Sequence, residues 1–82
     1  MADVTYTYAR KTKIIRAHLD MTQSKFARLI GVTLPTVRNW EQKARADPNG
    51  SARALIDVFF ADPTAAKNLL ERGRVKAKQI GL

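Results

Sequence analysis

Hydrophobic residues recur along the chain at three- and four-residue steps, in five blocks separated by turn residues. This spacing places apolar side chains on one face of an α-helix, so each block predicts an amphipathic helix. The predicted helices cover residues 10–19, 23–30, 34–43, 52–61 and 63–73. The sequence therefore predicts an all-α, five-helix domain over residues 10–73, with an N-terminal arm over residues 1–9 and a basic tail over residues 74–82.

Turn and capping residues predict where these helices begin and end. Asp20 and Gly31 are residue types that enter the left-handed conformation at low cost, so each is expected to end a helix. Thr22, Thr33 and Ser51 each precede or open an apolar block. Their hydroxyl groups are expected to accept a hydrogen bond from a free amide of the first helical turn.

The two ends of the chain have different patterns. Residues 3–8, DVTYTY, alternate apolar and polar side chains as a strand does, but one short strand is not stable alone. We expect either a flexible arm or a strand that pairs with another chain. Residues 74–82 are basic and only weakly periodic, and they are expected to be disordered or ordered by a partner.

Charge narrows the class of partner. Fifteen Lys and Arg against seven Asp and Glu leave a net charge of +8, with a pI near 10.5. A basic domain of this size indicates a polyanionic partner, most often nucleic acid, although the same charge also serves solubility. RNA is disfavoured, because neither an aromatic-bearing sheet nor a GXXG loop is present.

Several kinds of chemistry find no support in the sequence. There is no cysteine and His18 is the only histidine, so neither a disulfide nor a metal site is expected. No serine has a histidine or cysteine partner for nucleophilic catalysis, so we expect no enzyme activity and no cofactor. The chain has no signal-peptide-like or membrane-spanning apolar run, which predicts a cytoplasmic protein without a membrane partner.

The best-defined motif is a helix-turn-helix over residues 23–40. Ala27 supplies a small side chain where two helices cross, and Gly31 supplies the turn between them. The apolar residues expected to hold the two helices together are Phe26, Ile30, Val32, Val37 and Trp40. Such agreement at fixed spacing favours a DNA-binding motif over an arbitrary pair of helices.

The outer side of the third helix is the candidate for reading DNA. If Val37 and Trp40 face inward, Arg38 and Asn39 face outward at about 100° per residue. Arginine can form a two-pronged contact with guanine, and asparagine can do so with adenine. The residues predicted to read bases are Thr33, Leu34, Pro35, Thr36, Arg38 and Asn39. A solvated helix face is the alternative for these polar side chains.

The words MTQSKFARLIGVTLPTVRNWEQ resemble the helix-turn-helix of the lambda-repressor-like (Cro/CI, XRE) family of DNA-binding domains. Within that family the chain is more similar to HigA- and MqsA-type antitoxins. The shared features are the wording VRNWEQ, the proline-containing loop after it, GSARALI and a last helix that begins with DP. The resemblance implies an ion pair between Arg16 and Glu41 that fixes the third helix. It also implies that Gln23 clamps a phosphate at the start of the second helix. The expected phosphate contacts are Gln23, Ser24, Lys25, Lys43 and Arg45.

The last two helices carry more apolar side chains than a small core needs. We expect Phe59, Phe60, Leu69 and Leu70 to form a homodimer interface, with a somewhat larger core as the alternative. The function predicted is a dimeric repressor that binds a double-stranded DNA operator and is the antitoxin of a type II toxin–antitoxin module. Two alternatives remain: neutralising a RelE-like toxin as the main activity, or a phage Cro-like repressor without a toxin.

Overall fold

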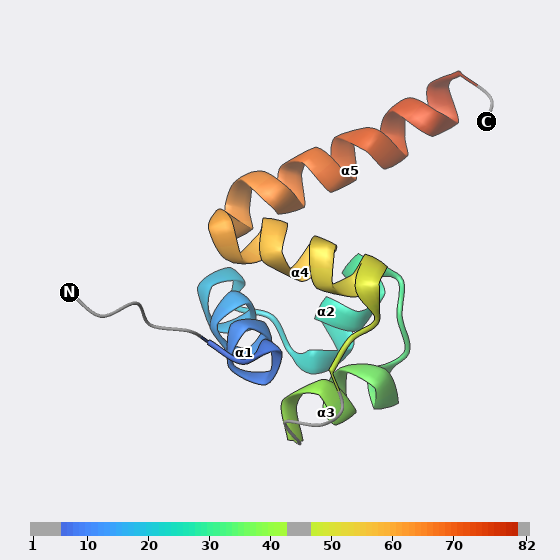
Figure 1. Ribbon diagram of the computed structural model, residues 1–82. Helices are drawn as coiled ribbons and strands as arrows, with labels where there is room; N and C mark the ends of the chain where they lie inside the picture. Colours follow the sequence, from blue (N-terminus) through green and yellow to red (C-terminus); the bar gives the residue numbers. More distant parts are fainter. Residues whose placement is uncertain (1–5, 43–46, 81–82) are drawn as a thin grey trace.

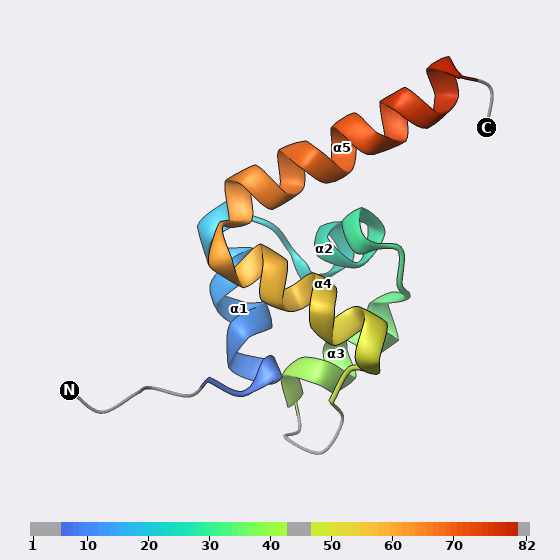
Figure 2. The same cartoon turned by 45° about the horizontal axis from the view of Figure 1, so that its top comes forward.

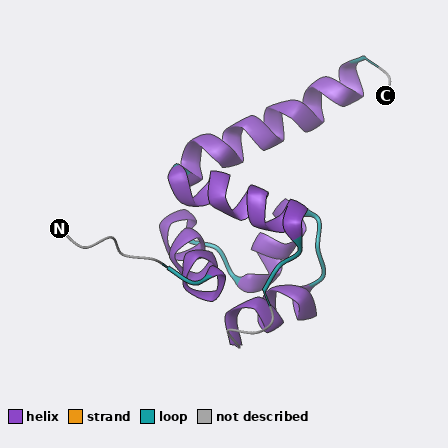
Figure 3. Cartoon of the chain, viewed as in Figure 1, coloured by secondary structure: helices purple, strands orange, loops and turns teal. Residues whose placement is uncertain are grey.

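Five α-helices make up the fold, and the computed structural model describes them over residues 6–42 and 47–80 (Figure 1). The helices are α1 (Tyr8–Leu19), α2 (Gln23–Ile30), α3 (Leu34–Gln42), α4 (Gly50–Ala61) and α5 (Pro63–Gln79). Figure 3 shows only helices and loops in the described part of the chain. The all-α prediction is therefore confirmed.

The first four helices surround one core, and α5 lies across it. α4 runs between α3 on one side and α5 on the other, in both views of the molecule (Figures 1 and 2). α5 contacts α1 and α4 through its first turns and then extends away from the other helices. The outer face of α3 and the free end of α5 thus lie on opposite sides of the domain.

Side chains from four helices meet in the core. Ile15, Phe26, Val37, Ile56 and Phe59 are all fully buried. The rings of Phe26 and Phe59 meet edge to face, with their centroids 6.0 Å apart. Burying each of these side chains contributes roughly 1.5–3 kcal/mol relative to leaving it exposed, so the core is the main source of stability.

The helix ends around α2 follow the predicted caps. Asp20 and Gly31 both lie in the left-handed region, with φ of 54° and 83°. The Thr22 hydroxyl accepts a hydrogen bond from the Lys25 amide at 3.1 Å, and the Thr33 hydroxyl accepts one from the Thr36 amide at 3.3 Å. Local sequence therefore determines both ends of α2 and the start of α3.

Two helix starts differ from the prediction. α1 begins at Tyr8 rather than residue 10, because the Thr7 hydroxyl accepts from the Arg10 amide at 3.2 Å. Tyr8 is therefore helical and not part of a strand. Ser51 is not the cap of α4; the Asn49 side chain accepts from the Ala52 amide at 3.0 Å and starts the helix one residue before Ser51. Asparagine is as good an N-cap as serine, and here it comes first along the chain.

The end of α5 also differs. The Asp62 carboxylate accepts from the Ala65 amide at 3.2 Å, which starts the helix at Pro63 as predicted. The helix does not stop near Gly73 but continues through it to Gln79. A glycine inside a helix costs only roughly 0.5–1 kcal/mol relative to alanine, which is too little to end a helix by itself. Much of the expected basic tail is therefore helical.

The N-terminal end of α1 is tied to α4 by a polar and aromatic cluster. Lys11 Nζ donates to Asp57 Oδ1 at 2.8 Å, and Tyr8 Oη donates to Asp57 Oδ2 at 3.0 Å. The Lys11 ammonium lies 4.7 Å from the Tyr8 ring centroid and 5.5 Å from that of Phe60. The ring of Tyr6 packs on Phe60 with centroids 5.5 Å apart. Residues just before α1 thus contact the domain.

These contacts shift the titration of two groups. Hydrogen bonds from Lys11 and Tyr8 stabilise the Asp57 carboxylate and lower its pKa. The Tyr8 hydroxyl donates to that carboxylate, and this hydrogen bond raises the pKa of Tyr8. The cluster therefore favours the charged aspartate and the neutral tyrosine.

Candidate nucleic-acid interface

α2 and α3 form a helix-turn-helix with a short, tightly bonded turn. The amides of Gly31 and Val32 both donate to the Ala27 carbonyl, at 2.9 and 3.0 Å. Ala27 is only 3% exposed, and its small side chain lies within the core beside α3 residues such as Val37. The left-handed Gly31 turns the chain so that only three residues separate α2 from α3.

One face of α3 is open to solvent along its length. Four residues are exposed, and each lies three or four positions from two of the others: Pro35, Arg38, Asn39 and Gln42. On a helix this spacing puts them in one continuous stripe. No hydrogen bond joins the side chain of Arg38 or Asn39 to another described residue. Among the described residues, their donor and acceptor groups therefore have no competing partner.

The start of α3 is less open. Leu34 and Thr36 are half-buried, whereas Thr33 and Pro35 are exposed. The hydroxyl oxygens of Thr33 and Thr36 lie 2.7 Å apart and share a hydrogen bond. Of the residues predicted to read bases, these two threonines thus already bond to each other, while Arg38 and Asn39 have no such bond within the part of the chain that the structure describes.

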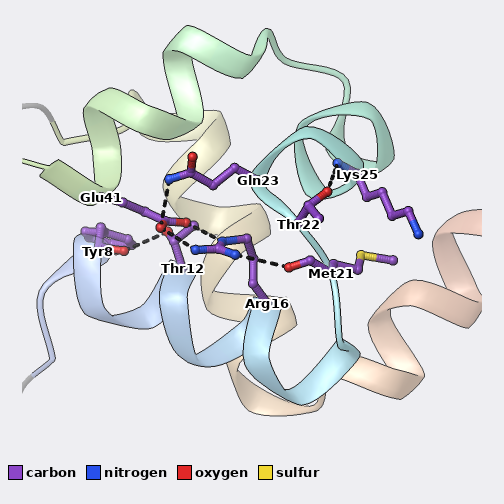
Figure 4. A network of polar contacts seen from close by, with 8 residues as sticks. All are labelled: Tyr8, Thr12, Arg16, Met21, Thr22, Gln23, Lys25 and Glu41. Carbon is purple, nitrogen blue, oxygen red and sulfur yellow. Dashed lines mark hydrogen bonds and ion pairs between the residues drawn. The ribbon is translucent and has the colours of Figure 1, made fainter.

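An ion pair fixes the C-terminal half of α3 to α1 (Figure 4). Arg16 Nε and Nη2 donate to the two carboxylate oxygens of Glu41, each at 2.7 Å. Arg16 Nη1 donates to the Met21 carbonyl at 3.1 Å, and Gln23 Nε2 donates to Glu41 Oε1 at 3.1 Å. These contacts join α1, the loop before α2, the start of α2 and the end of α3.

Burial strengthens this network. The Glu41 side chain is only 3% exposed and that of Arg16 is 22% exposed, so the two charges are largely shielded from water. The hydrogen bonds to Glu41 raise the pKa of the Arg16 guanidinium above its ordinary value. A two-pronged arginine–carboxylate contact also fixes direction, so the pair that the resemblance implied holds α3 at a defined angle.

The expected phosphate contacts lie around the start of α2. Ser24 and Lys25 are exposed, and Figure 4 shows the Lys25 side chain pointing away from the Arg16–Glu41 pair. Gln23 is half-buried, and its amide nitrogen is already used by Glu41. Lys43 and Arg45 lie outside the described residues.

Two features of this surface were missed by reasoning from sequence. Gln42 extends the open stripe of α3, and its signal was the same three- and four-residue spacing continued for one further turn. The bond from Gln23 to Glu41 joins residues 18 positions apart, and no local pattern pointed to it.

The predicted dimer residues do not form one exposed surface. Phe59 is fully buried in the core, so its assignment to a dimer interface was wrong. Phe60 and Leu70 are half-buried and pack against the core. Leu69 is 61% exposed, and Val58 on α4 is 56% exposed. Phe59 packs against Phe26 of α2 inside the core, which agrees with the alternative of a somewhat larger core.

Other kinds of site are not seen in the described residues. No group of three or more histidine, aspartate and glutamate side chains there lies close enough to hold a metal ion. Over the same residues, none of the helices combines the length and apolar character needed to cross a bilayer.

Comparison with known proteins gives two matches. Residues 13–52 match the helix-turn-helix family. Over 57 residues the chain is 35% identical to Antitoxin HigA-2 of Vibrio cholerae serotype O1, which covers 70% of this chain and 54% of that protein. The chain thus spans about half the length of the curated relative it matches. No solved structure matches the chain significantly.

Proposed function

Residues 13–52 belong to the XRE-type helix-turn-helix family, and from this premise we propose that the chain regulates transcription by binding double-stranded DNA sequence-specifically. The observation that carries the proposal is the exposed stripe of α3, in which Arg38 and Asn39 have no side-chain partner among residues 6–42 and 47–80. The buried Arg16–Glu41 pair supports it, because a reading helix must be held at a fixed angle.

In this proposal α3 enters the major groove, which is wide enough to admit a helix. Arg38 donates to O6 and N7 of a guanine, and Asn39 bonds to N6 and N7 of an adenine. Each such pair supplies about 1–3 kcal/mol of discrimination against the wrong base. Pro35 and Leu34 lie at the start of the helix, where apolar contact with thymine methyl groups suits them.

Phosphate contacts position the helix without reading sequence. The first amides of α2 point toward an anion at the helix N-terminus, and Lys25 adds a positive charge beside them. Ser24 contributes an exposed hydroxyl. The Gln23 amide nitrogen carries two hydrogens; one is donated to Glu41, and the other can be donated to a phosphate. The net charge of +8 favours association with the polyanionic duplex.

We further infer a homodimer and an antitoxin role. Exposed Leu69 and Val58 offer apolar contact for a second copy, and a two-fold dimer would read two half-sites about one helical turn apart. The likeness to a protein named an antitoxin supports pairing with a toxin. We infer that this toxin is RelE-like and that its gene lies beside the gene for this chain. A Cro-like repressor is the rival. Co-purification with the neighbouring gene product favours the antitoxin, and its absence favours the Cro-like repressor.

The decisive experiment selects preferred sequences from a pool of random duplexes. Wild type should enrich a defined motif. The double variant Arg38→Ala, Asn39→Ala should lose about 2–6 kcal/mol of discrimination, because two base contacts of about 1–3 kcal/mol each are removed. Binding to unselected duplex should persist, since the phosphate contacts remain.

A matched control is available on α5, where Asn68 and Arg72 are also exposed. The variant Asn68→Ala, Arg72→Ala removes the same residue types at a place that the DNA does not reach. It should select the wild-type motif. If the α3 variant still enriches that motif as strongly as wild type, Arg38 and Asn39 do not read bases.

A further inference from the structure

The distal half of α5, residues 71–79, carries a surface that the fold does not use. It extends away from the other helices (Figures 1 and 2), and Ile80 just beyond it is 59% exposed. A side chain added at Gly73 would meet no atom within 4 Å. This face of α5 has no partner in the described part of the chain.

The apolar stripe of α5 continues from inside the domain to the free end. Its members are separated by steps of four, three, four and three residues: Ala66, Leu70, Gly73, Ala77 and Ile80. Ala66 is buried and Leu70 packs against the core, so the first part of the stripe is a helix-packing surface already. Alternating steps of four and three are the spacing at which one helix follows another. The shape of the free part therefore fits another helix.

Positive charges border the free part of the stripe on both sides. Arg74 follows Gly73 and Lys76 precedes Ala77, so in heptad terms they occupy the two flanking positions. Side chains at these positions face their counterparts on a partner helix and determine which partner is accepted. Residues 71–79 contain four Lys or Arg and one Glu, a net charge of +3. A partner with acidic flanking residues is favoured.

A second copy of this helix does not meet that requirement. In a parallel pair Lys76 would face Arg74, and in an antiparallel pair each would face its own equivalent. Both arrangements oppose like charges across a helix pair, which is unfavourable. A dimer through Leu69 or Val58 is compatible with this argument. Such a dimer does not require residues 73–80 of one copy to pack against the same residues of the other.

The duplex held by α3 does not suit this surface either. α3 and the free end of α5 lie on opposite sides of the domain, so one duplex does not contact both (Figures 1 and 2). A phosphate backbone would also leave the apolar stripe in water. We propose that residues 70–80 dock an acidic amphipathic helix of another protein. Its apolar side chains would pack on Gly73, Ala77 and Ile80, and its carboxylates would pair with Arg74 and Lys76.

The test uses the full chain and two synthetic helical peptides labelled with a fluorophore. Both carry leucine at the heptad core positions; one has glutamate and the other lysine at the flanking positions. By fluorescence anisotropy the glutamate peptide should bind and the lysine peptide should not. Arg74→Glu with Lys76→Glu should weaken the glutamate peptide about tenfold and admit the lysine peptide.

The control variant is Arg10→Glu with Lys13→Glu, which makes the same change of net charge on exposed positions of α1. It should leave the binding of both peptides unchanged, and circular dichroism should show equal helix content in both variants. Equal weakening in the two variants would mean that only net charge matters and would overturn the proposal. The proposal would also be overturned if the Arg74→Glu, Lys76→Glu variant alone lost binding to random duplex, because these two side chains would then bind nucleic acid. Neither result bears on Arg38 and Asn39, whose test is motif enrichment.

Discussion

The strongest stability prediction concerns the Arg16–Glu41 pair. In the variant Arg16→Met, the Glu41 carboxylate loses both short hydrogen bonds and keeps only the one from Gln23. Removing one partner of a buried ion pair costs about 3–5 kcal/mol. The Arg16 side chain is 22% exposed, and solvent screening lowers the expected loss to about 3 kcal/mol. A domain of this size has only roughly 4–12 kcal/mol of total stability, so the loss is large.

The measurement is urea unfolding followed by far-ultraviolet circular dichroism, with Trp40 fluorescence as a second probe. In thermal unfolding the midpoint should fall by about 12–24 °C, at roughly 4–8 °C per kcal/mol for a small domain. Lys67→Met is the matched control, because it removes one partner of the exposed Lys67–Glu71 pair, whose closest atoms are 3.4 Å apart. Such helix-surface pairs contribute about 0.2–0.5 kcal/mol.

A double variant separates charge burial from loss of packing. Arg16→Met with Glu41→Met removes both charges, so no buried carboxylate is left without its partner. Apolar replacement of a whole buried pair is often neutral, and the double variant should recover most of the stability lost in Arg16→Met. A loss below about 1 kcal/mol in Arg16→Met would show that the pair behaves like a surface ion pair. A double variant less stable than the single one would contradict the burial argument directly.

Three further predictions follow from local geometry and charge. Gly31→Ala should lower the free energy of unfolding by about 1–2 kcal/mol, because φ is 83° there. Gly73→Ala, at an open position inside α5, should instead raise the helix content measured by circular dichroism. If both substitutions changed stability and helix content in the same direction, the conformational argument would be refuted. The pKa of Asp57 is lowered in the folded state, so its charged form stabilises the fold. This contribution to the free energy of unfolding is complete above the unfolded-state pKa of about 3.9 and is lost as pH falls through the folded-state pKa. Asp57→Asn should therefore flatten the acid limb of a stability–pH curve, and an unchanged limb would show that Lys11 and Tyr8 do not stabilise the charge. Binding to duplex DNA should weaken steeply with salt as counterions are released, and a flat response in anisotropy titrations would argue against phosphate anchoring.

Sequence alone determined those features that depend on neighbouring residues. The periodicity of apolar side chains identified all five helices, because a helix buries one face at a fixed spacing. Asp20, Thr22 and Gly31 identified the ends of α2 and the turn before it, since each acts within a few residues of itself. The inward Val37 and Trp40 likewise determined which side of α3 faces out. These interactions need no knowledge of distant parts of the chain.

The tertiary structure decided whatever depends on how the helices approach one another. Sequence pattern could not tell that Phe59 is buried, because its burial depends on distant residues such as Phe26, which packs against its ring. The Lys11–Asp57 bond joins residues 46 positions apart, and the bond from Gln23 to Glu41 joins residues 18 apart. The free apolar face of α5 also became visible only when Ala66 and Leu70 were seen to occupy the core. Periodicity records which face of a helix is apolar, but only the packed domain decides which part of that face is covered.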